Sequence, residues 1–470
     1  MARKRLHAMT ANSPWDYDQA LAELWRRSSY ERGLISDPFG DAARAERGLA
    51  RMRALLALLG NPQLRYPTVH IAGSKGKGST GAFIASAATR AGLRVGFYTS
   101  PHLHRFPERI AIDGRPLPDE DFAAQAETVT HAAAVLDAAA PDAETVSTFE
   151  FVTAMGFAAF ARHNCDLAVI EVGLGGRFDS TNVLAPTVSV ITRIDLEHTA
   201  VLGSTYGEIA AQKAGIMRAG VPCVASPQPP EAREVIEDIA ATVGAPLFVG
   251  GRDWTWTGSW RSFTAAGPWG AWEGLSLGIA GPHQVENACT ALAALHLLNS
   301  AGISISEAAI RRGLARARWP GRFERWAVGE REIVFDAAHT PAAAAALVET
   351  WRDADLPPHA TVILGMGADK NLRAFLETIR PIVGHLIVTR SDNPRAAPLE
   401  TIAAIADELG IPHETQPSVA ASIAAATKTI PAPLLITGSL FVAGEGREVL
   451  GLAEPDLIWR ALNEVRDPQH

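Results

Sequence analysis

The chain has 470 residues, of which 47% are hydrophobic and 20% charged, and this globular composition excludes a disordered or low-complexity scaffold. Its formal net charge of −8 argues against a dedicated nucleic-acid-binding protein, which would carry a basic excess. Three widely spaced cysteines give neither zinc spacing nor a disulfide framework, and no uncharged apolar run approaches the roughly 18 residues that span a bilayer, so we expect a cytoplasmic protein without a nucleic-acid or membrane partner.

Apolar β-branched runs alternate with Ala- and Leu-rich amphipathic runs along the chain. This pattern predicts an α/β fold with a mostly parallel sheet covered by helices on both faces. In the first part of the chain, strands are expected at 67–72, 93–99, 167–172, 188–194 and 221–225. Helices are expected at 44–59, 80–91, 151–162, 206–217 and 287–300.

Residues 251–277 differ in composition from the rest of the chain, because five of the 11 tryptophans lie there among Gly, Ser and Thr. This pattern predicts antiparallel hairpins with one buried face. The alternative is a base-stacking platform, but the segment lacks the basic residues that such a platform needs.

The dipeptide Pro320-Gly321 breaks both helix and strand, so residues 319–322 read as a hinge. A second alternating set follows, with strands expected at 332–335, 361–364, 385–388 and 434–436 and the clearest helix at 341–351. We therefore expect a P-loop-type ATPase domain with a mostly parallel sheet at 1–317 and a smaller Rossmann-like α/β domain at 318–470.

The segment Gly73-Ser74-Lys75-Gly76-Lys77-Gly78-Ser79-Thr80, here called the phosphate loop, joins an expected strand to an expected helix. Glycines let backbone N–H groups converge on a phosphate, the helix N-terminus adds positive potential, and Lys77 supplies a point charge. The strict P-loop pattern is not met, because Gly78 stands where a hydroxyl normally follows the lysine. A plain tight turn is the alternative, but the strand–loop–helix context favours a phosphate site.

Three polar residues follow strands that are expected to share one sheet edge: Ser100, Glu171 and His198. Ligands in open α/β sheets gather beyond the carboxyl ends of the strands. Taken singly, Glu171 reads equally well as a salt-bridge partner, and His198 as a surface or helix-capping residue. Together, beside a phosphate loop, they favour a magnesium site, although histidine is an uncommon ligand for this hard cation.

Other candidates follow helices or strands at positions that also suit structural roles. Lys213 lies late in an expected helix, where a lysine is favourable against the helix dipole. Gln284 and Asn287 lie near an expected helix start, where capping is the alternative. Arg322 lies in the hinge, Asp336 and His339 follow the first expected strand of the second domain, and Lys370 and residues 391–395 are weaker candidates beyond later strands.

The phosphate loop resembles that of the folylpolyglutamate synthase/dihydrofolate synthase family, a branch of the Mur-type ATP-dependent amino-acid ligases. That family's loop runs Gly-Thr-Asn-Gly-Lys-Gly-Ser, so Ser74 and Lys75 replace its Thr-Asn pair, and the family typically has Asp where this chain has Glu197. Further matches run in order along the chain, among them Tyr98-Thr99-Ser100-Pro101-His102-Leu103, Thr148-Phe149-Glu150-Phe151, residues 171–182, Lys213-Ala214-Gly215-Ile216, Gly281-Pro282-His283-Gln284, Pro320-Gly321-Arg322-Phe323, Asp336-Ala337-Ala338-His339 and Gly438-Ser439-Leu440.

The resemblance implies ATP as co-substrate and magnesium, as two ions, as cofactor. It assigns ATP contacts to Gly73, Gly76, Lys77, Gly78, Ser79, Thr80, Asn287, Arg322 and Asp336. It assigns metal ligation to Ser100, Glu171, His198 and Lys213, with Lys213 carbamylated as in related ligases. Substrate contacts fall to Phe149, Glu150, Arg177, His339 and Ser439, and the catalytic roles to Lys77, Lys213 and His339.

The implied reaction is the ATP-dependent addition of L-glutamate to dihydropteroate, to a reduced folate, or to both, by a monomer that works through an acyl phosphate. Two alternatives stay open. One is a sister ligase that acts on another acid, such as a UDP-sugar peptide. The other is an ATP-dependent switch that ligates nothing, against which the set of Glu171, His198 and Lys213 and the second α/β domain both argue.

Overall fold

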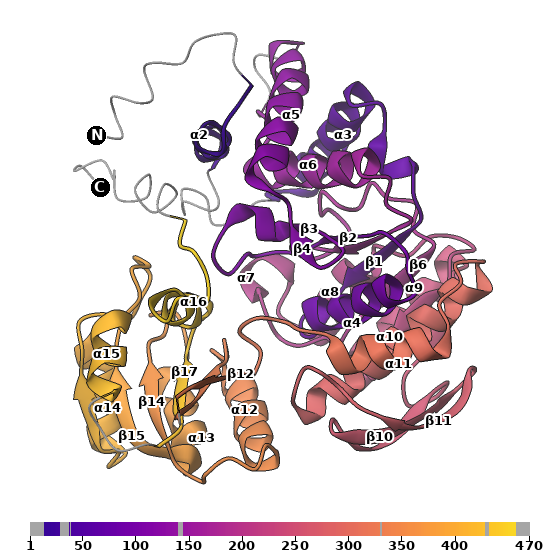
Figure 1. Ribbon diagram of the computed structural model, residues 1–470. Coiled ribbons are helices and arrows are strands. Elements are labelled where there is room, and N and C mark those ends of the chain that lie inside the picture. The colour runs from indigo at the N-terminus through magenta and orange to yellow at the C-terminus, as the bar shows by residue number, and fades with distance from the viewer. Residues whose placement is uncertain are drawn as a thin grey trace.

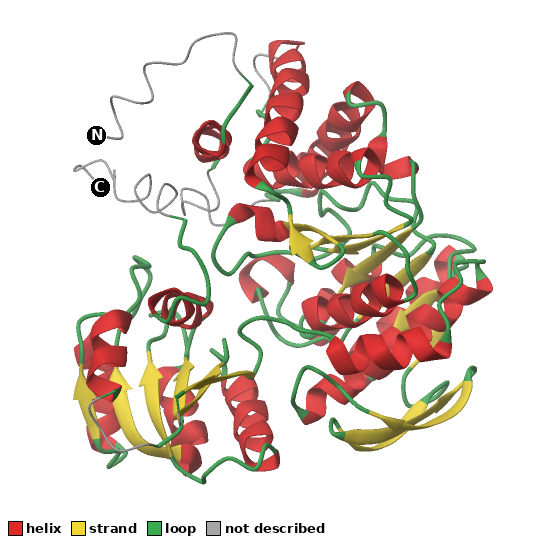
Figure 2. Ribbon diagram, viewed as in Figure 1, coloured by secondary structure: helices red, strands yellow, loops and turns green. Residues whose placement is uncertain are grey.

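The structure is a computed structural model that describes residues 14–28, 37, 39–139, 144–329, 331–427 and 432–456. It shows a larger N-terminal region and a smaller C-terminal region, each built on its own sheet and joined through the hinge (Figure 1, Figure 2). Among the described residues, no helix combines the length and the apolar character that crossing a membrane requires.

An eight-stranded sheet forms the centre of the N-terminal region, in the order β4-β3-β2-β5-β1-β6-β7-β8. Its strands are β1 (Thr68–Ala72), β2 (Val95–Tyr98), β3 (Ile110–Ile112), β4 (Arg115–Pro116), β5 (Leu167–Glu171), β6 (Val188–Ile191), β7 (Cys223–Ala225) and β8 (Leu247–Val249). All pair in parallel except β3 and β4, which form an antiparallel edge. Because β1 lies between β5 and β6, the carboxyl ends of these three strands and of β2 open onto one edge.

Helices bury both faces of this sheet. They are α2 (Tyr17–Arg27), α3 (Ala42–Leu58), α4 (Lys77–Arg90), α5 (Asp119–Ala139), α6 (Thr148–Arg162), α7 (Thr199–Leu202), α8 (Tyr206–Ala214), α9 (Pro230–Val243), α10 (Pro282–Ser300) and α11 (Glu307–Arg316). Along β5, Leu167 and Val169 join the core beneath α4, α10 and α11, whereas Ala168 and Ile170 join the core beneath α3, α5 and α6. Burial on both sides explains why this strand is apolar throughout and does not alternate.

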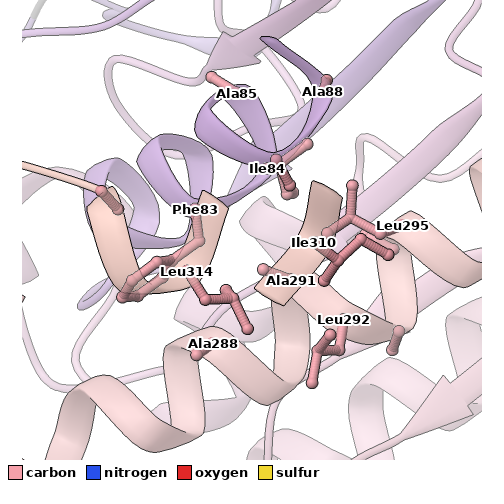
Figure 3. Packing of buried hydrophobic residues seen from close by; sticks show 14 of the residues in the cluster. Phe83, Ile84, Ala85, Ala88, Ala288, Ala291, Leu292, Leu295, Ile310 and Leu314 are labelled. Atoms are coloured by element: carbon pink, nitrogen blue, oxygen red, sulfur yellow. The ribbon is translucent and has the colours of Figure 1, made fainter. Parts of the chain in front are cut away.

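Helix α4, which follows the phosphate loop, is held rigidly from below by α10 and α11. Phe83 and Ile84 of α4 lie against apolar side chains of those two helices (Figure 3). At Gly313 of α11 a side chain would come within 2.4 Å of the Ala87 backbone, so the two helices approach closely only because this position is glycine. The N-terminus of α4 therefore has a fixed position relative to the sheet.

The tryptophan-rich segment forms an antiparallel sheet of three strands, which confirms the prediction for residues 251–277. The strands are β9 (Thr255–Ser259), β10 (Ser262–Gly267) and β11 (Gly270–Leu275). Phe263, Ala265 and Leu275 are buried in the same core as α10 and α11. The sheet thus has one buried face, as expected.

The C-terminal region has a six-stranded sheet in the order β12-β13-β17-β14-β15-β16, parallel except for β12. Its strands are β12 (Glu324–Val328), β13 (Arg331–Phe335), β14 (Ala360–Leu364), β15 (Val383–Val388), β16 (His413–Thr415) and β17 (Leu434–Thr437), and its helices are α12 (Pro341–Asp353), α13 (Leu372–Ile379), α14 (Leu399–Glu408), α15 (Val419–Ala426) and α16 (Leu440–Val449). Short 3-10 helices lie at η1 (Pro62–Leu64), η2 (Phe106–Arg109) and η3 (Arg380–Ile382).

Several expected boundaries were wrong. The edge strands β12 and β16 were not predicted, because edge strands are exposed and lack an apolar run; Asp336 therefore follows the second strand of its sheet and not the first. Helix α4 begins at Lys77, three residues earlier than expected, and α10 begins at Pro282. Asn287 consequently lies inside α10, beyond the reach of a capping position.

Candidate active site

A cavity of about 2980 Å³ lies between the two regions. It is lined by the phosphate loop, by the carboxyl edge of the large sheet, by the hinge and by the loops after β13, β14, β15 and β17. The candidate residues on its wall are Gly76, Lys77, Gly78, Ser79, Ser100, Phe149, Glu150, Glu171, His198, Asn287, Arg322, Asp336, His339 and Ser439. The predicted site residues thus come from both regions and face one space.

The phosphate loop is shaped by two glycines with positive φ, Gly73 at 147° and Gly76 at 89°. A Cβ on Gly73 would lie 1.9 Å from Thr192 Oγ1, so no other residue fits there. Gly76 stands at the N-cap of α4 without any side-chain cap, which leaves the first N–H groups of the helix open to a ligand. Lys77 Nζ donates to the Gly73 carbonyl at 3.0 Å, so the ammonium is folded over the loop.

Glu171 is buried at the end of β5, beside the loop. Burial raises the pKa of its carboxyl group, while Lys77, the Thr99 hydroxyl, the Ser100 backbone amide and Arg322 act in the opposite direction. Thr99 Oγ1 donates a hydrogen bond to one carboxylate oxygen. A buried carboxylate with cations on two sides is a suitable ligand for a hard metal ion.

Lys213 is buried in α8, and its Nζ donates to the same Gly73 carbonyl at 2.9 Å. Burial lowers the pKa of Lys213 to about 7, and the nearby charge of Lys77 adds to the effect. A small cavity of about 10 Å³, room for about one water molecule, lies among Lys213, Lys77, His198 and Glu197. Lys213 therefore sits beneath the loop as an amine that loses its proton near neutral pH, far below the usual range of a lysine.

Within the described part of the chain, no three His, Cys, Asp or Glu side chains gather as a ready-made metal cage. The predicted ligands fall into two groups, one at Glu171 with Ser100 and one at Lys213 with His198. This arrangement suits magnesium, which keeps several waters and is usually bound through one or two carboxylates together with substrate phosphates.

Two side chains from outside the phosphate loop press against its glycines. A Cβ on Gly76 would lie 2.2 Å from Asn287 Oδ1, so Asn287 of α10 touches the loop. A Cβ on Gly78 would lie 2.8 Å from Cζ2 of Trp319, the residue that begins the hinge. The missing hydroxyl at position 78 thus has a steric reason: the indole of Trp319 occupies the space.

We expect Gly78→Ala to raise the KM for ATP about tenfold, because a methyl group forced against a packed indole costs about 1–3 kcal/mol. Steady-state kinetics at varied ATP measures this effect. In a Trp319→Leu background the same substitution should raise the KM for ATP clearly less. An equal penalty in both backgrounds would show that Trp319 is not the cause.

The hinge is fixed by Asp336, whose two carboxylate oxygens accept hydrogen bonds from the backbone amides of Phe323, at 2.9 Å, and Ala338, at 2.8 Å. The resemblance implies an ATP contact for Asp336, whereas this geometry favours a role in orienting the hinge. Arg322 reaches the cavity and makes no side-chain hydrogen bond or ion pair with the residues that the structure describes, so its guanidinium is available to an anion.

His339 and Ser439 lie on the C-terminal wall of the cavity. The pKa of His339 is lowered, chiefly by burial, and its Nδ1 lies 2.9 Å from the Ala337 carbonyl oxygen. Nδ1 must therefore carry the proton, which leaves Nε2 as an acceptor. Ser439 is the N-cap of α16, and its hydroxyl accepts from the Val442 amide at 3.0 Å.

Charged side chains on the wall of the same cavity connect the two regions. His104 Nδ1 lies 3.0 Å from Glu448 Oε1, and Arg447 donates to His104 Nε2 at 3.1 Å and also pairs with Glu324. His104 follows the Ser100 loop, Glu324 begins β12, and the other two residues lie in α16. The loop that carries Ser100 is thus tied directly to the C-terminal region.

The predicted substrate residues differ in how they are placed. Phe149 lines the cavity and packs on Gly173, where a Cβ would lie 2.3 Å from its ring. Glu150 is buried and already engaged, since it accepts from Arg51 Nε at 3.0 Å and from the Ser147 backbone amide at 2.8 Å, which completes the capping box of α6. The N-cap of α6 is Ser147, and Thr148 is the first residue of the helix.

Four predicted residues do not line the main cavity: Gly73 and Lys213, which line the small cavity beneath the loop, and Arg177 and Thr80. Arg177 is exposed and does not line the cavity, although its guanidinium lies 5.0 Å from the centre of the ring of Phe178, which does. Thr80 is fully buried in α4 with its hydroxyl unpaired, whereas the adjacent Ser79 faces the cavity. The sequence analysis did not assign a site role to Trp319, although this residue is the first of the predicted hinge.

Comparisons with known proteins agree with this geometry. The family described as Mur ligase, glutamate ligase domain, matches residues 321–440. A Bacillus subtilis protein named dihydrofolate synthase/folylpolyglutamate synthase is 34% identical, covering 86% of this chain and 95% of its own. The structure of Mycobacterium tuberculosis folylpolyglutamate synthase complexed with ADP superimposes with a TM-score of 0.83 at 31% identity, covering 94% of this chain and 100% of that one. The Escherichia coli FolC in complex with DHPP and ADP gives a TM-score of 0.79 at 30% identity, with 94% and 99% covered.

Proposed function

The chain belongs to the folylpolyglutamate synthase/dihydrofolate synthase family, and we propose that it joins L-glutamate to dihydropteroate, to a reduced folate, or to both, with hydrolysis of ATP to ADP and phosphate. One observation carries this assignment: a cavity brings a phosphate loop in the N-terminal region face to face with the part of the chain that matches a glutamate ligase domain. We also propose, from the family alone, that the enzyme acts in the cytoplasm as a monomer without nucleic-acid or membrane partners.

Amide formation from a free carboxylate needs activation, because a carboxylate has no good leaving group. In the proposed reaction an oxygen of the acceptor carboxylate attacks the γ-phosphorus of ATP, and the bond to the β-phosphate oxygen breaks to release ADP. The amine of glutamate then attacks the acyl carbon, and the tetrahedral intermediate expels inorganic phosphate. Positioning and charge stabilisation supply most of the catalysis in such phosphoryl transfers.

The residues on the N-terminal wall suit the first step. The open amides at the start of α4, with Lys77, would hold the β- and γ-phosphates, and Arg322 would reach the same phosphates from the hinge with its forked geometry. Glu171 and Ser100 would hold one magnesium ion, which supplies charge neutralisation on the transferring group. Closure of the two regions around the cavity would exclude the water that hydrolyses acyl phosphates.

The environment of Lys213 supports its carbamylation. An uncharged amine attacks the carbon of CO2 to give a carbamate and a proton, and a lysine with a pKa of about 7 is uncharged far more often than an exposed one. The carbamate would add two oxygens that share one negative charge beside His198, and together these groups would hold a second magnesium ion.

We assign the second step to residues on the C-terminal wall of the cavity. The acceptor would bind beside Phe149, which also lines the cavity. Nε2 of His339 would accept a proton from the incoming ammonium, and Ser439 and Lys370 would hold the carboxylates of glutamate; all three residues line the cavity. Phe149 offers a ring face on which the flat pterin would stack. Glu150 contributes through the helix cap that positions Phe149.

Mass spectrometry of the products from dihydropteroate, or from a reduced folate, with ATP and glutamate tests the proposal directly. We expect a mass gain of one or more glutamyl residues on at least one of the two acceptors. Phosphate release that needs glutamate and a UDP-sugar acid, with none from pteroate or folate, would support the sister ligase. ATP turnover that needs neither acid nor amine would support the switch.

A further inference from the structure

Two departures from the family pattern, Lys75 in the phosphate loop and Glu197 before His198, contact each other. Lys75 Nζ lies 2.8 Å from Glu197 Oε1, although 122 positions separate the residues. Their side chains are 33% and 25% exposed, so water screens the pair only in part. Taken separately in the sequence, the two departures from the family pattern look unrelated. The ion pair shows that the two residues are partners in the fold.

The ion pair is the last of four bonds between the phosphate loop and residues 193–198. The backbone amides of Ser74 and Lys75 both donate to the Arg193 carbonyl, at 3.0 Å and 3.1 Å, and Ser74 Oγ donates to the Asp195 carbonyl at 2.9 Å. The segment then reaches His198, whose φ of 54° places it in the left-handed region. The position of His198 relative to the phosphate loop therefore depends on these contacts.

The charges around the pair favour a positioning role for Lys75 over direct contact with phosphate. Lys75 Nζ already has a partner in Glu197 Oε1, while Lys77 is folded over the loop. Both lysines line the cavity, but the Lys75 ammonium is paired with a carboxylate of the neighbouring segment, whereas Lys77 donates to the loop itself.

We propose that Lys75 and Glu197 are a matched pair of positioning residues that sets His198 relative to the bound nucleotide in this chain, an inference that rests on the proposed function. The match depends on length. Aspartate at position 197 would fall short by roughly 1.5 Å, the length of one C–C bond, and would lose the hydrogen bond to Lys75. The family residue should therefore be harmful here unless position 75 changes with it.

The test measures binding of a non-hydrolysable ATP analogue by calorimetry, with and without Mg2+. In Glu197→Asp and in Lys75→Asn, the gain in affinity that Mg2+ gives should fall about fivefold, the size of a partly exposed ion pair that is broken on one side. The double variant, which restores the family's Asn and Asp, should return to within about twofold of the wild type. Glu237→Asp, in the exposed pair with Arg233 on α9, is the control and should change nothing.

Other outcomes overturn the inference in distinct ways. Additive losses in the double variant would show that the residues act independently. A loss in Lys75→Asn without one in Glu197→Asp would make Lys75 a direct phosphate ligand, and equal losses of nucleotide affinity with and without Mg2+ would reduce the pair to a structural contact. Each of these can occur in an enzyme that forms glutamylated product, whereas failure of the wild type to bind nucleotide would reject the proposed function itself.

Discussion

Lys77→Ala should lower kcat/KM by about a thousandfold, the scale seen when one preorganised charge or donor is removed from a reacting group. Lys77 is the first residue of α4, and it is the lysine that folds over the loop at the carboxyl edge of the sheet. Its removal also takes a cation away from buried Glu171, whose pKa should then rise further. Glutamate-dependent phosphate release at saturating acceptor is the measurement.

Two controls separate charge from folding in this experiment. Lys77→Arg keeps the charge but replaces a compact ammonium with a larger planar group, so it should recover only a small part of the activity. Arg311→Ala, on the exposed side of α11, should retain full activity. If the Lys77→Ala enzyme kept its melting temperature and a near-normal kcat/KM, the nucleotide would not bind at this loop.

Much of the fold was predictable because it depends on local pattern. The buried strands β1, β5, β6 and β14 are short apolar runs, and each was placed to within a few residues. The strands that were not predicted are β3, β4, β8, β12 and β16. All but β3 lie at sheet edges, where one side is exposed and the apolar signal is weak, and β3 is a short strand that pairs with the edge strand β4. Helix α4 was placed late because the helical hydrogen bonds begin inside a glycine-rich loop that reads as irregular.

The site was predictable where a motif carries it and unpredictable where it depends on tertiary contact. The loop, Glu171, Lys213 and the hinge were found because their residue types suit phosphate and metal chemistry. No local pattern in the sequence predicts that the Trp319 indole packs against Gly78 or that Arg177 is exposed. Nor does any local pattern predict that Glu150 is already hydrogen-bonded to Arg51 and to the cap of its own helix. The pairing of Lys75 with Glu197 is of the same kind, because only the fold brings β1 and β6 side by side.

Lys213→Ala should lower the rate of glutamate-dependent phosphate release by about a hundredfold or more, and short carboxylic acids should restore part of it. The substitution leaves a space beneath the loop beside His198 and the Gly73 carbonyl, and acetate or formate can place a carboxylate there. Lys213→Met is the matched comparison, because its side chain fills the space without an amine. It should lose activity equally and should not respond to acetate.

The pH dependence gives an independent check on the same residue. Carbamate formation uses the uncharged amine, and burial has lowered the pKa of Lys213 to about 7. Activation of the wild-type enzyme by preincubation with bicarbonate should therefore increase as the pH rises through about 7, since the amine loses its proton over that range. Lys213→Ala should show no such activation. Wild-type activity in Lys213→Ala or Lys213→Met would contradict a carbamate at this position, and so would activation that is strongest at acid pH. Lys213 would then only donate a hydrogen bond to the phosphate loop.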